Sequence, residues 1–249
     1  MSTPTAPHRV LKKYYASEGD RQRFVTNLFD SAARYYDWSC ALGSFGSGQY
    51  YRRWVLLGSG LEAGMKLLDI ATGTGLVARA ATTVLPERGA VIGLDPSFGM
   101  LREGRPTHSA LLVQGRMEDL PFAAGHFDFV SVGYALRHVA DLGVAFAECL
   151  RVLKPGGRVL LLEISRPHSI VGRWVARTYL DWVLPFVMRV ATGSAQAKLL
   201  MKYHYDTIVE CVPPPTILEV LTSSGFVDVD HRVRGGGFLS EYLARKPRT

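Results

Sequence analysis

Cysteine is scarce in this sequence of 249 residues. Its three cysteines, Cys40, Cys149 and Cys211, are odd in number, lie far apart and form no Cys-x-x-Cys pair. A disulfide framework or a zinc site needs cysteines in paired spacing. We therefore expect neither a disulfide nor a metal site, and the composition is typical of a reducing cytoplasm.

A long uninterrupted hydrophobic run is also missing. The most apolar window, residues 174–190, is interrupted by charged residues and proline at Arg177, Asp181, Pro185 and Arg189. Such a window is too short and too charged to span a bilayer, although it can lie on one. Residues 1–7 are polar and contain proline without an apolar signal core, so we expect no export, a cytoplasmic location and a flexible stretch over residues 1–20.

No block of basic residues accompanies the formal charge of +7. Arginine and lysine are scattered and lack the interleaved aromatic residues of a nucleic-acid surface, so we expect no nucleic-acid partner. Attraction to anionic lipid headgroups or acidic metabolites stays open. With 47% hydrophobic residues, the chain is long enough for a single large domain, which we place at residues 21–249.

What the sequence does contain is a pattern for a nucleotide-shaped ligand. The apolar run at 66–71 predicts a buried strand, and Gly73 and Gly75 allow a sharp turn into a helix beginning near Leu76. Asp95 closes the next apolar run, 95 − 73 = 22 residues beyond Gly73. At this spacing a carboxylate binds the two hydroxyls of a ribose. A ribose-bearing cofactor is therefore expected.

Two cofactor classes fit this turn. Residues 73–78 match the G-x-G-x-x-A spelling of a dinucleotide-binding fold. Asp69, however, lies four residues before Gly73, where its carboxylate would attract the ammonium group of S-adenosylmethionine and repel a pyrophosphate. The chain downstream also offers no separate substrate domain. These two features favour S-adenosylmethionine.

Strand and helix signals alternate from residue 66 onward. Apolar runs predict strands at 66–71, 90–95, 111–115, 127–133 and 158–164, with helices near 76–85, 97–103 and 141–153. Alternation of this kind is typical of a parallel sheet covered on both faces. Two late runs predict a final pair of strands at 227–233 and 238–244, and two helices are predicted ahead of the sheet at 24–38 and 50–57.

An aromatic helical region interrupts the alternation at about 167–205. The predicted fold is therefore α/β: a Rossmann-like seven-stranded, mostly parallel sheet with an antiparallel C-terminal edge hairpin, N-terminal helices and a helical lid insertion. The insertion alternates apolar and basic faces. This pattern predicts a lid that covers an apolar substrate and also contacts the membrane surface. A helix pair that covers the core is the alternative, and a homodimer is a further open expectation.

Seven segments of the chain carry a resemblance to a known family: FDSAARYYD, LLDIATGTG, GLDPSFGML, GRMEDLPF, FDFVSVGYALRHV, ECLRVLKPGGRVLLLEISRP and YHYDTIVEC. Together, over roughly residues 24–245, they resemble the ubiquinone/menaquinone biosynthesis C-methyltransferases, a class I S-adenosylmethionine-dependent group. The resemblance implies methyl transfer to a ring carbon of a quinol-like or prenylated aromatic acceptor. It implies S-adenosylhomocysteine as the spent cofactor and no metal.

The resemblance also implies which residues hold the cofactor. The methionine end is expected at the first turn, on Asp69, Gly73, Thr74 and Gly75. The ribose is expected on Asp95, and the adenine between Pro96 and Met100 with its edge along Arg116 and Met117. The transferring methyl group is expected over Gly133 and Tyr134. For Met100 and Met117, packing in the core is an equal alternative.

Methylation of a ring carbon requires a neighbouring hydroxyl to lose its proton. Arg137 stays protonated, so it is expected to stabilise the resulting oxyanion, and His138, which stands where the family has asparagine, is expected to be the base. Tyr203 is expected to shape the acceptor site. The alternatives are a hydrogen bond from His138 to a nearby carbonyl and simple packing of Tyr203.

His138 also favours a second reading, an O- or N-methyltransferase that tailors an apolar small natural product, because a neutral base beside a hydroxyl suits methylation of oxygen. A third reading is a cofactor-binding module that has lost transfer activity or catalyses cyclisation. In the first two readings the expected partner is an apolar aromatic or lipid-like small molecule.

Overall fold

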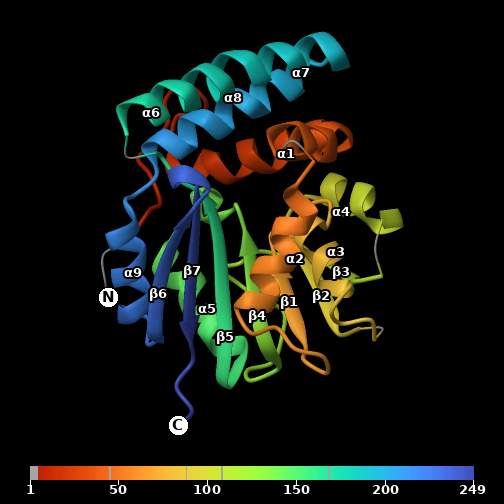
Figure 1. Ribbon diagram of the computed structural model, residues 1–249, viewed down its shortest axis with the longest axis vertical. Helices are drawn as coiled ribbons and strands as arrows, with labels where there is room; N and C mark the ends of the chain where they lie inside the picture. The colour runs from red at the N-terminus through yellow and green to blue at the C-terminus, as the bar shows by residue number, and fades with distance from the viewer. Residues whose placement is uncertain (1–4, 45, 88, 108, 168) are drawn as a thin grey trace.

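A computed structural model describes residues 5–44, 46–87, 89–107, 109–167 and 169–249. Residues 1–4 of the predicted flexible stretch and residue 168 of the predicted insertion lie outside this range. The described chain forms one seven-stranded sheet in the order β3-β2-β1-β4-β5-β7-β6, with helices on both faces and a layer of helices across one edge (Figure 1).

Five strands are parallel and two are antiparallel, which confirms the predicted fold class. The parallel strands are β1 (Leu67–Ile70), β2 (Val91–Asp95), β3 (Leu111–Gln114), β4 (Phe127–Gly133) and β5 (Leu153–Ile164). β7 (Leu239–Arg245) pairs antiparallel with β5, and β6 (Val227–Arg234) pairs antiparallel with β7. Strands buried on both faces are read as continuous apolar runs, which is why their positions could be predicted.

The start of β5 differs from the prediction. Residues 154–157 read as a turn because they contain proline and two glycines, yet β5 already begins at Leu153, which pairs with Phe127 of β4. A register shift follows on β4 between Phe127 and Phe129, and Gly156 adopts a left-handed φ of 78°. A bulge of this kind lets glycine stay within the strand instead of ending it.

Helices pack against the two faces of the sheet. α2 (Gly48–Gly58) and α3 (Leu76–Thr82) share one apolar cluster with β1, β2 and β4. α5 (Leu142–Val152) and α9 (Pro214–Ser223) bury their apolar sides in a larger cluster on the other face. α4 (Phe98–Gly104) follows β2, and short helical turns lie at η1 (Arg105–Thr107), η2 (Leu136–His138) and η4 (Gly235–Gly237).

A layer of helices lies across the carboxyl ends of the parallel strands and combines the first helix with the insertion (Figure 1). It contains α1 (Glu18–Gly43), α6 (Ile170–Ala176), the π-helical η3 (Arg177–Val183), α7 (Leu184–Thr192) and α8 (Ala195–Glu210). A third apolar cluster holds α1, α7 and α8 together through residues such as Leu28, Met188 and Leu200. This layer, which we call the helical cap, covers the carboxyl ends of the parallel strands.

Residues 5–17 run along the sheet domain as an extended segment. Thr5 accepts a hydrogen bond from the amide of Leu142, and Pro7 accepts one from the amide of Val212. His8 and Tyr15 are buried. This part of the predicted flexible stretch therefore packs on the protein, and its flexibility and the proposed domain boundary at residue 21 stay predictions. Within the described residues, no helix is long and apolar enough to cross a membrane.

Candidate active site

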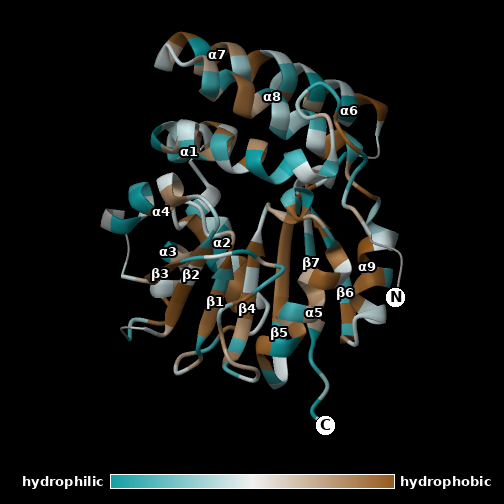
Figure 2. Ribbon diagram, turned by 180° about the vertical axis from the view of Figure 1, so that it is seen from behind, coloured by the Kyte–Doolittle hydropathy of each residue, from teal (hydrophilic) through white to brown (hydrophobic). Residues whose placement is uncertain are grey.

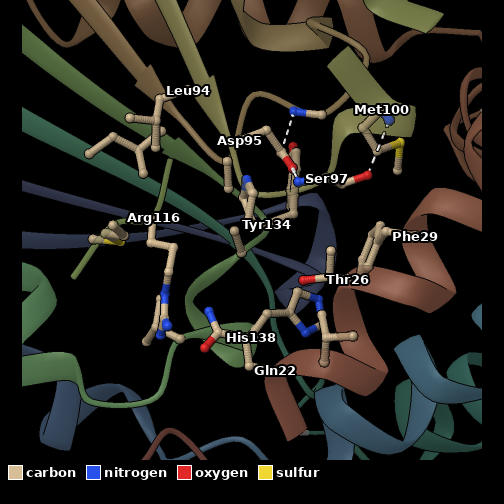
Figure 3. A pocket seen from close by; sticks show the side chains of 18 of the residues that line it. Gln22, Thr26, Phe29, Leu94, Asp95, Ser97, Met100, Arg116, Tyr134 and His138 are labelled. Carbon is tan, nitrogen blue, oxygen red and sulfur yellow. Dashed lines mark hydrogen bonds between the residues drawn. The ribbon is translucent and has the colours of Figure 1, made fainter. Parts of the chain in front are cut away.

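A cavity opens where the carboxyl ends of β1, β2 and β4 meet the underside of α1. It encloses about 770 Å³ of empty space, its mouth included. The sheet side is formed by Ile70, Ala71, Gly73, Leu94, Asp95, Pro96, Ser97, Met100, Arg116, Met117, Glu118, Gly133, Tyr134, Ala135, His138 and Val139. The α1 side is formed by Gln22, Val25, Thr26, Phe29 and Tyr36, three of which are labelled in Figure 3.

The turn between β1 and α3 presents backbone to this cavity. Ala71, Gly73 and Gly75 adopt left-handed φ values of 52°, 59° and 83°. A Cβ at Gly73 would meet only the Cε1 atom of Tyr36, at 4.0 Å. The space beside Gly73 is therefore open enough for a ligand to approach the backbone, and the predicted contact with the cofactor stays a prediction.

Asp95 joins this turn to the end of β2. Its carboxylate accepts hydrogen bonds from the amides of Gly73 and Ser97, both at 2.8 Å (Figure 3). Burial raises the pKa of Asp95 to about 6, against the opposing effect of these two amides. Each carboxylate oxygen keeps a further lone pair. Asp95 is thus fixed in place with acceptor capacity left for two ribose hydroxyls.

An apolar slot lies beside Asp95. Pro96, Met100 and Met117 line it, and Met100 and Met117 are also part of the buried interior. Both methionines pack in the core and also border the cavity, and their predicted contact with the ligand stays a prediction. Arg116 borders the slot and pairs with Glu118, with 3.6 Å between Arg116 Nε and a carboxylate oxygen. The predicted binding of adenine between Pro96 and Met100 stays a prediction.

Asp69 lies beneath the turn and not in the cavity wall. Its side chain is 0% exposed and accepts hydrogen bonds from Thr72 Oγ1 at 2.6 Å, Ser131 Oγ at 2.7 Å and the amide of Ala78 at 3.1 Å. Burial raises the pKa of Asp69 to about 6. In this arrangement Asp69 fixes the turn through protein donors, and the predicted contact with an ammonium group stays a prediction.

Two acids of α1 that were not among the predicted site residues hold the loops after β1 and β2. Asp30 accepts hydrogen bonds from Ser97 Oγ at 2.5 Å and from the amide of Gly99 at 2.7 Å. Asp37, seven residues later on the same helix, accepts hydrogen bonds from Thr74 Oγ1 and from Arg79. Thr74 and Gly75 therefore support the turn without lining the cavity. The seven-residue spacing of the two acids was the available signal.

His138 lines the cavity on the side away from Asp95 (Figure 3). Its ring stacks on Tyr203, with centroids 5.5 Å apart, and Nδ1 lies 3.5 Å from the Tyr203 hydroxyl. Nε2 is buried and has no hydrogen-bond partner among the described residues. Burial and the nearby Arg137 charge lower the pKa of His138 well below its ordinary value. The imidazole is therefore neutral, and Nε2 is the ring nitrogen without a partner among the described residues.

Tyr203 and Arg137 lie behind His138 and outside the cavity wall. Tyr203 is fully buried between Tyr14, Phe24 and His138. Arg137 is also buried; Nη2 donates to the carbonyl of Tyr134 at 3.1 Å, and Nε lies 3.4 Å from a Glu163 oxygen. The structure thus brings His138 to the cavity and places Tyr203 and Arg137 in its support, where their predicted contacts with the acceptor stay predictions.

Gly133 and Tyr134 form the floor of the cavity at the end of β4. Tyr134 has a left-handed φ of 62°, and its amide donates to the carbonyl of Leu162 at 2.6 Å. Left-handed backbone at an aromatic residue is strained and persists where surrounding contacts enforce it.

Over the described part of the chain, no three His, Cys, Asp or Glu side chains gather as ligands for a metal ion.

Comparisons with known proteins agree with this geometry. A model of the ubiE/COQ5 methyltransferase family matches residues 16–246. The chain is 32% identical over 241 residues to the ubiquinone/menaquinone biosynthesis C-methyltransferase UbiE of Shewanella baltica, covering 94% of this chain and 95% of the relative. It is 31% identical over 251 residues to UbiE of Shewanella piezotolerans, covering 98% of each.

Solved structures share the fold. A SAM-dependent methyltransferase from Thermotoga maritima superposes with a TM-score of 0.63 at 18% identity, covering 88% of this chain and 99% of that one. Phosphoethanolamine N-methyltransferase 2 of Haemonchus contortus, in complex with S-adenosyl-L-methionine, gives a TM-score of 0.65 at 17% identity, covering 94% of this chain and 61% of that one. The chain belongs to the ubiE/COQ5 methyltransferase family and is an S-adenosylmethionine-dependent methyltransferase.

Proposed function

We propose that this enzyme methylates a ring carbon of a quinol-like or prenylated aromatic acceptor. The curated relatives are named for C-methylation in ubiquinone and menaquinone biosynthesis. The α1 side of the cavity supports an apolar aromatic ligand, since Val25, Phe29 and Tyr36 face the sheet side there. The observation that carries the proposal is the match over 94–98% of this chain to relatives named for C-methylation. The buried, unpaired Nε2 of His138 in the cavity wall supplies the candidate base.

The residues divide into a cofactor side and an acceptor side. Asp95 would hold the ribose, the slot of Pro96, Met100 and Met117 would hold the adenine, and Gly73 would let the chain approach the methionine end. S-adenosylmethionine supplies a methyl group activated by a sulfonium sulfur. The protein's contribution is to align this methyl with the acceptor carbon, at about 3–3.5 Å, and to exclude water.

The acceptor side moves one proton. Nε2 of His138 accepts the proton of the acceptor hydroxyl, which makes the neighbouring ring carbon nucleophilic. That carbon forms the new bond to the methyl group as the methyl–sulfur bond breaks. The ring carbon then loses its own hydrogen as a proton to solvent, and His138 returns its proton to the oxygen. One proton is released for each methyl group transferred.

Product analysis tests this proposal. The purified enzyme is incubated with methyl-labelled S-adenosylmethionine and a prenylated hydroquinone that has one unsubstituted ring carbon. The matched control acceptor is the same hydroquinone with that carbon already methylated. We expect label in a carbon-bound methyl group of the first acceptor and none in the second.

A second candidate function, methylation of oxygen or nitrogen, is favoured by the same His138, which would lie beside the acceptor hydroxyl. Label in a methoxy or N-methyl group, or equal labelling of both acceptors, would support it and reject methylation of carbon.

We further propose that the outer face of the helical cap binds an anionic membrane surface, where a prenylated acceptor would be found. Trp174 of α6 is 68% exposed, and Trp182 and Phe186 are each 67% exposed. Trp182, Phe186 and Val190 recur every four residues and therefore lie on one side of the helix. Figure 2 shows α6 and α7 as the outermost helices, with hydrophobic and hydrophilic residues alternating along them.

The charge of this face matches anionic lipid. Exposed basic residues flank the aromatic stripe at Arg166, Arg177, Arg189 and Lys198. The acidic residue in the same stretch, Asp181, lies 3.7 Å from Lys202 and is thereby neutralised. Aromatic residues at the headgroup level combined with lysine and arginine are typical of a helix that lies on a membrane.

Vesicle sedimentation tests the membrane proposal. We expect binding to vesicles with anionic lipid and little binding to neutral ones. The double variant Trp174→Ser/Phe186→Ser should lose most of this binding, whereas Tyr50→Ser, which removes an aromatic residue 80% exposed on α2, should keep it. If the double variant sedimented with anionic vesicles as the natural protein does, the face would not be a membrane site. A change from dimer to monomer with the same vesicle binding would instead assign the face to contact between two copies of the chain.

A further inference from the structure

A buried arginine of α2 has no acidic partner. Arg52 is only 7% exposed. Among the described residues it forms no ion pair and no hydrogen bond, and its Nε is completely buried. Its guanidinium carbon lies over the ring of Tyr134, 5.6 Å from the ring centroid, which is a cation–π contact. A buried cation without an anion is costly, so a group of opposite charge is expected beside it.

The chain makes room for this guanidinium. Gly48 lies one turn before Arg52 at the start of α2, and a Cβ at Gly48 would lie 2.5 Å from Nη1 of Arg52. The charge of Arg52 also lowers the pKa of Tyr36 and Asp69, opposing the larger effect of burial on each. Arg52 is therefore close to the β1–α3 turn and to the Tyr36 and Tyr134 side chains that line the cavity.

The strand order gives the cofactor a direction. The adenine slot lies by Met100 and Met117, after β2 and β3, and the ribose acceptor Asp95 lies at the end of β2. Continuing across the sheet from β2, the next strands are β1 and β4. The amino-acid end of S-adenosylmethionine would therefore lie over Gly73 and Gly133. Tyr134 lines this end of the cavity, and Arg52 lies directly behind it, against the Tyr134 ring.

We propose that Arg52 binds the carboxylate of the methionine moiety of S-adenosylmethionine. An arginine is suited to this because its planar fork matches a carboxylate and its charge cannot be removed by burial. The same charge repels the ammonium group of the cofactor, so the amino acid is held in one orientation and the sulfonium methyl is turned toward the acceptor side. Arg52 is a positioning residue, and its role is independent of which acceptor is methylated.

The test compares ligands that differ in one group. Calorimetric titration measures the affinity for S-adenosylmethionine and for its decarboxylated form, which keeps the adenine, ribose, sulfonium and amine. We expect the natural protein to prefer the carboxylate-bearing ligand. In Arg52→Met this preference should fall by about 10- to 100-fold, the size of a lost hydrogen bond to a charged group, while affinity for the decarboxylated ligand should not fall.

Two controls make the outcome decisive. Arg52→Lys keeps the charge without the fork and should retain part of the preference. Arg53→Met changes the exposed neighbour on α2, whose Nε donates to Thr83 at 3.2 Å, and should retain all of it. An equal loss of both ligands in Arg52→Met would mean a purely structural role, and an unchanged preference would mean that another residue binds the carboxylate; either result overturns the proposal. Binding of neither ligand by the natural protein would contradict the cofactor itself.

Discussion

The carboxylate of Asp95 is expected to set the lower limit of the pH range in which the cofactor binds. The pKa of Asp95 is raised to about 6 by burial. Ribose hydroxyls that donate to Asp95 stabilise its ionised form, so the pKa of Asp95 falls on binding, and affinity decreases as the pH drops below about 6. We expect the dissociation constant for S-adenosylhomocysteine to rise up to tenfold per pH unit there.

The variant Asp95→Asn isolates this effect. It removes one of the two acceptors that Gly73 and Ser97 use, so it should weaken binding at pH 7.5 and flatten the pH dependence measured by calorimetry. A steep dependence that persisted in Asp95→Asn would assign the titration to another group, with Asp69 the first to examine because its pKa is also about 6.

The role of His138 is likewise decided by one atom, Nε2. His138→Asn introduces the residue that the family has at this position and removes the nitrogen that can hold a proton. We expect kcat to fall by at least about 100-fold, the lower range for loss of a general base, with unchanged affinity for S-adenosylhomocysteine. Turnover equal to that of the natural enzyme across neutral pH would show that His138 serves only in packing.

Helix α1 holds the two cofactor loops in place through two carboxylates, an arrangement that we call the α1 clamp. Asp30 binds the loop after β2, and Asp37 binds the turn after β1. In Asp30→Ala the amides of the middle of α1 should exchange hydrogen faster, and affinity for S-adenosylhomocysteine should fall about tenfold, because Ser97 and Gly99 lose a charged acceptor. Hydrogen-exchange mass spectrometry and calorimetry measure the two effects.

The matched control for the clamp is Asp20→Ala. Asp20 lies in the first turn of the same helix and interacts with Ser17 within that turn. It should change neither the exchange of the middle of α1 nor the affinity. If Asp30→Ala and Asp20→Ala behaved alike, α1 would not hold the loops through Asp30.

Strands, helices and turns could be predicted where neighbouring residues in the sequence determine them. Contacts between these elements could not be predicted. The parallel strands were found because each contains a short apolar run, and the turn at Gly73 because glycine adopts left-handed backbone without strain. The start of β5 was missed because residues 154–157 resemble a turn locally. The residues on either side of them, Leu153 and Arg158, pair with β4 and so keep this stretch within the strand. Asp30 was missed because its partners, Ser97 and Gly99, lie far away in the sequence. Arg52 was missed because its burial against Tyr134 is a tertiary contact that no local pattern shows.

At the scale of the whole molecule, binding of the cofactor between the sheet and the helical cap should stabilise the folded protein against unfolding. S-adenosylhomocysteine at 100 times its dissociation constant should raise the free energy of unfolding by about 2.7 kcal/mol. For a chain of this size the melting temperature should rise about 2–4 °C for each kcal/mol. Thermal unfolding with and without ligand measures this rise.

Asp95→Asn, at the same ligand concentration, should show a smaller rise because its dissociation constant is higher. The expectation fails if a concentration that saturates binding in calorimetry leaves the melting temperature of the natural protein unchanged.

The position of β7 has a consequence for biosynthesis. β7, residues 239–245, lies between β5 and β6 and is the last strand along the described chain. While the ribosome still holds these residues, β5 has one uncovered edge, and β6 has no neighbour in the sheet. Uncovered edges pair readily with other chains. The nascent sheet is therefore complete only after residues 239–245 have left the ribosome, and until then the open edge of β5 stays available to other strands.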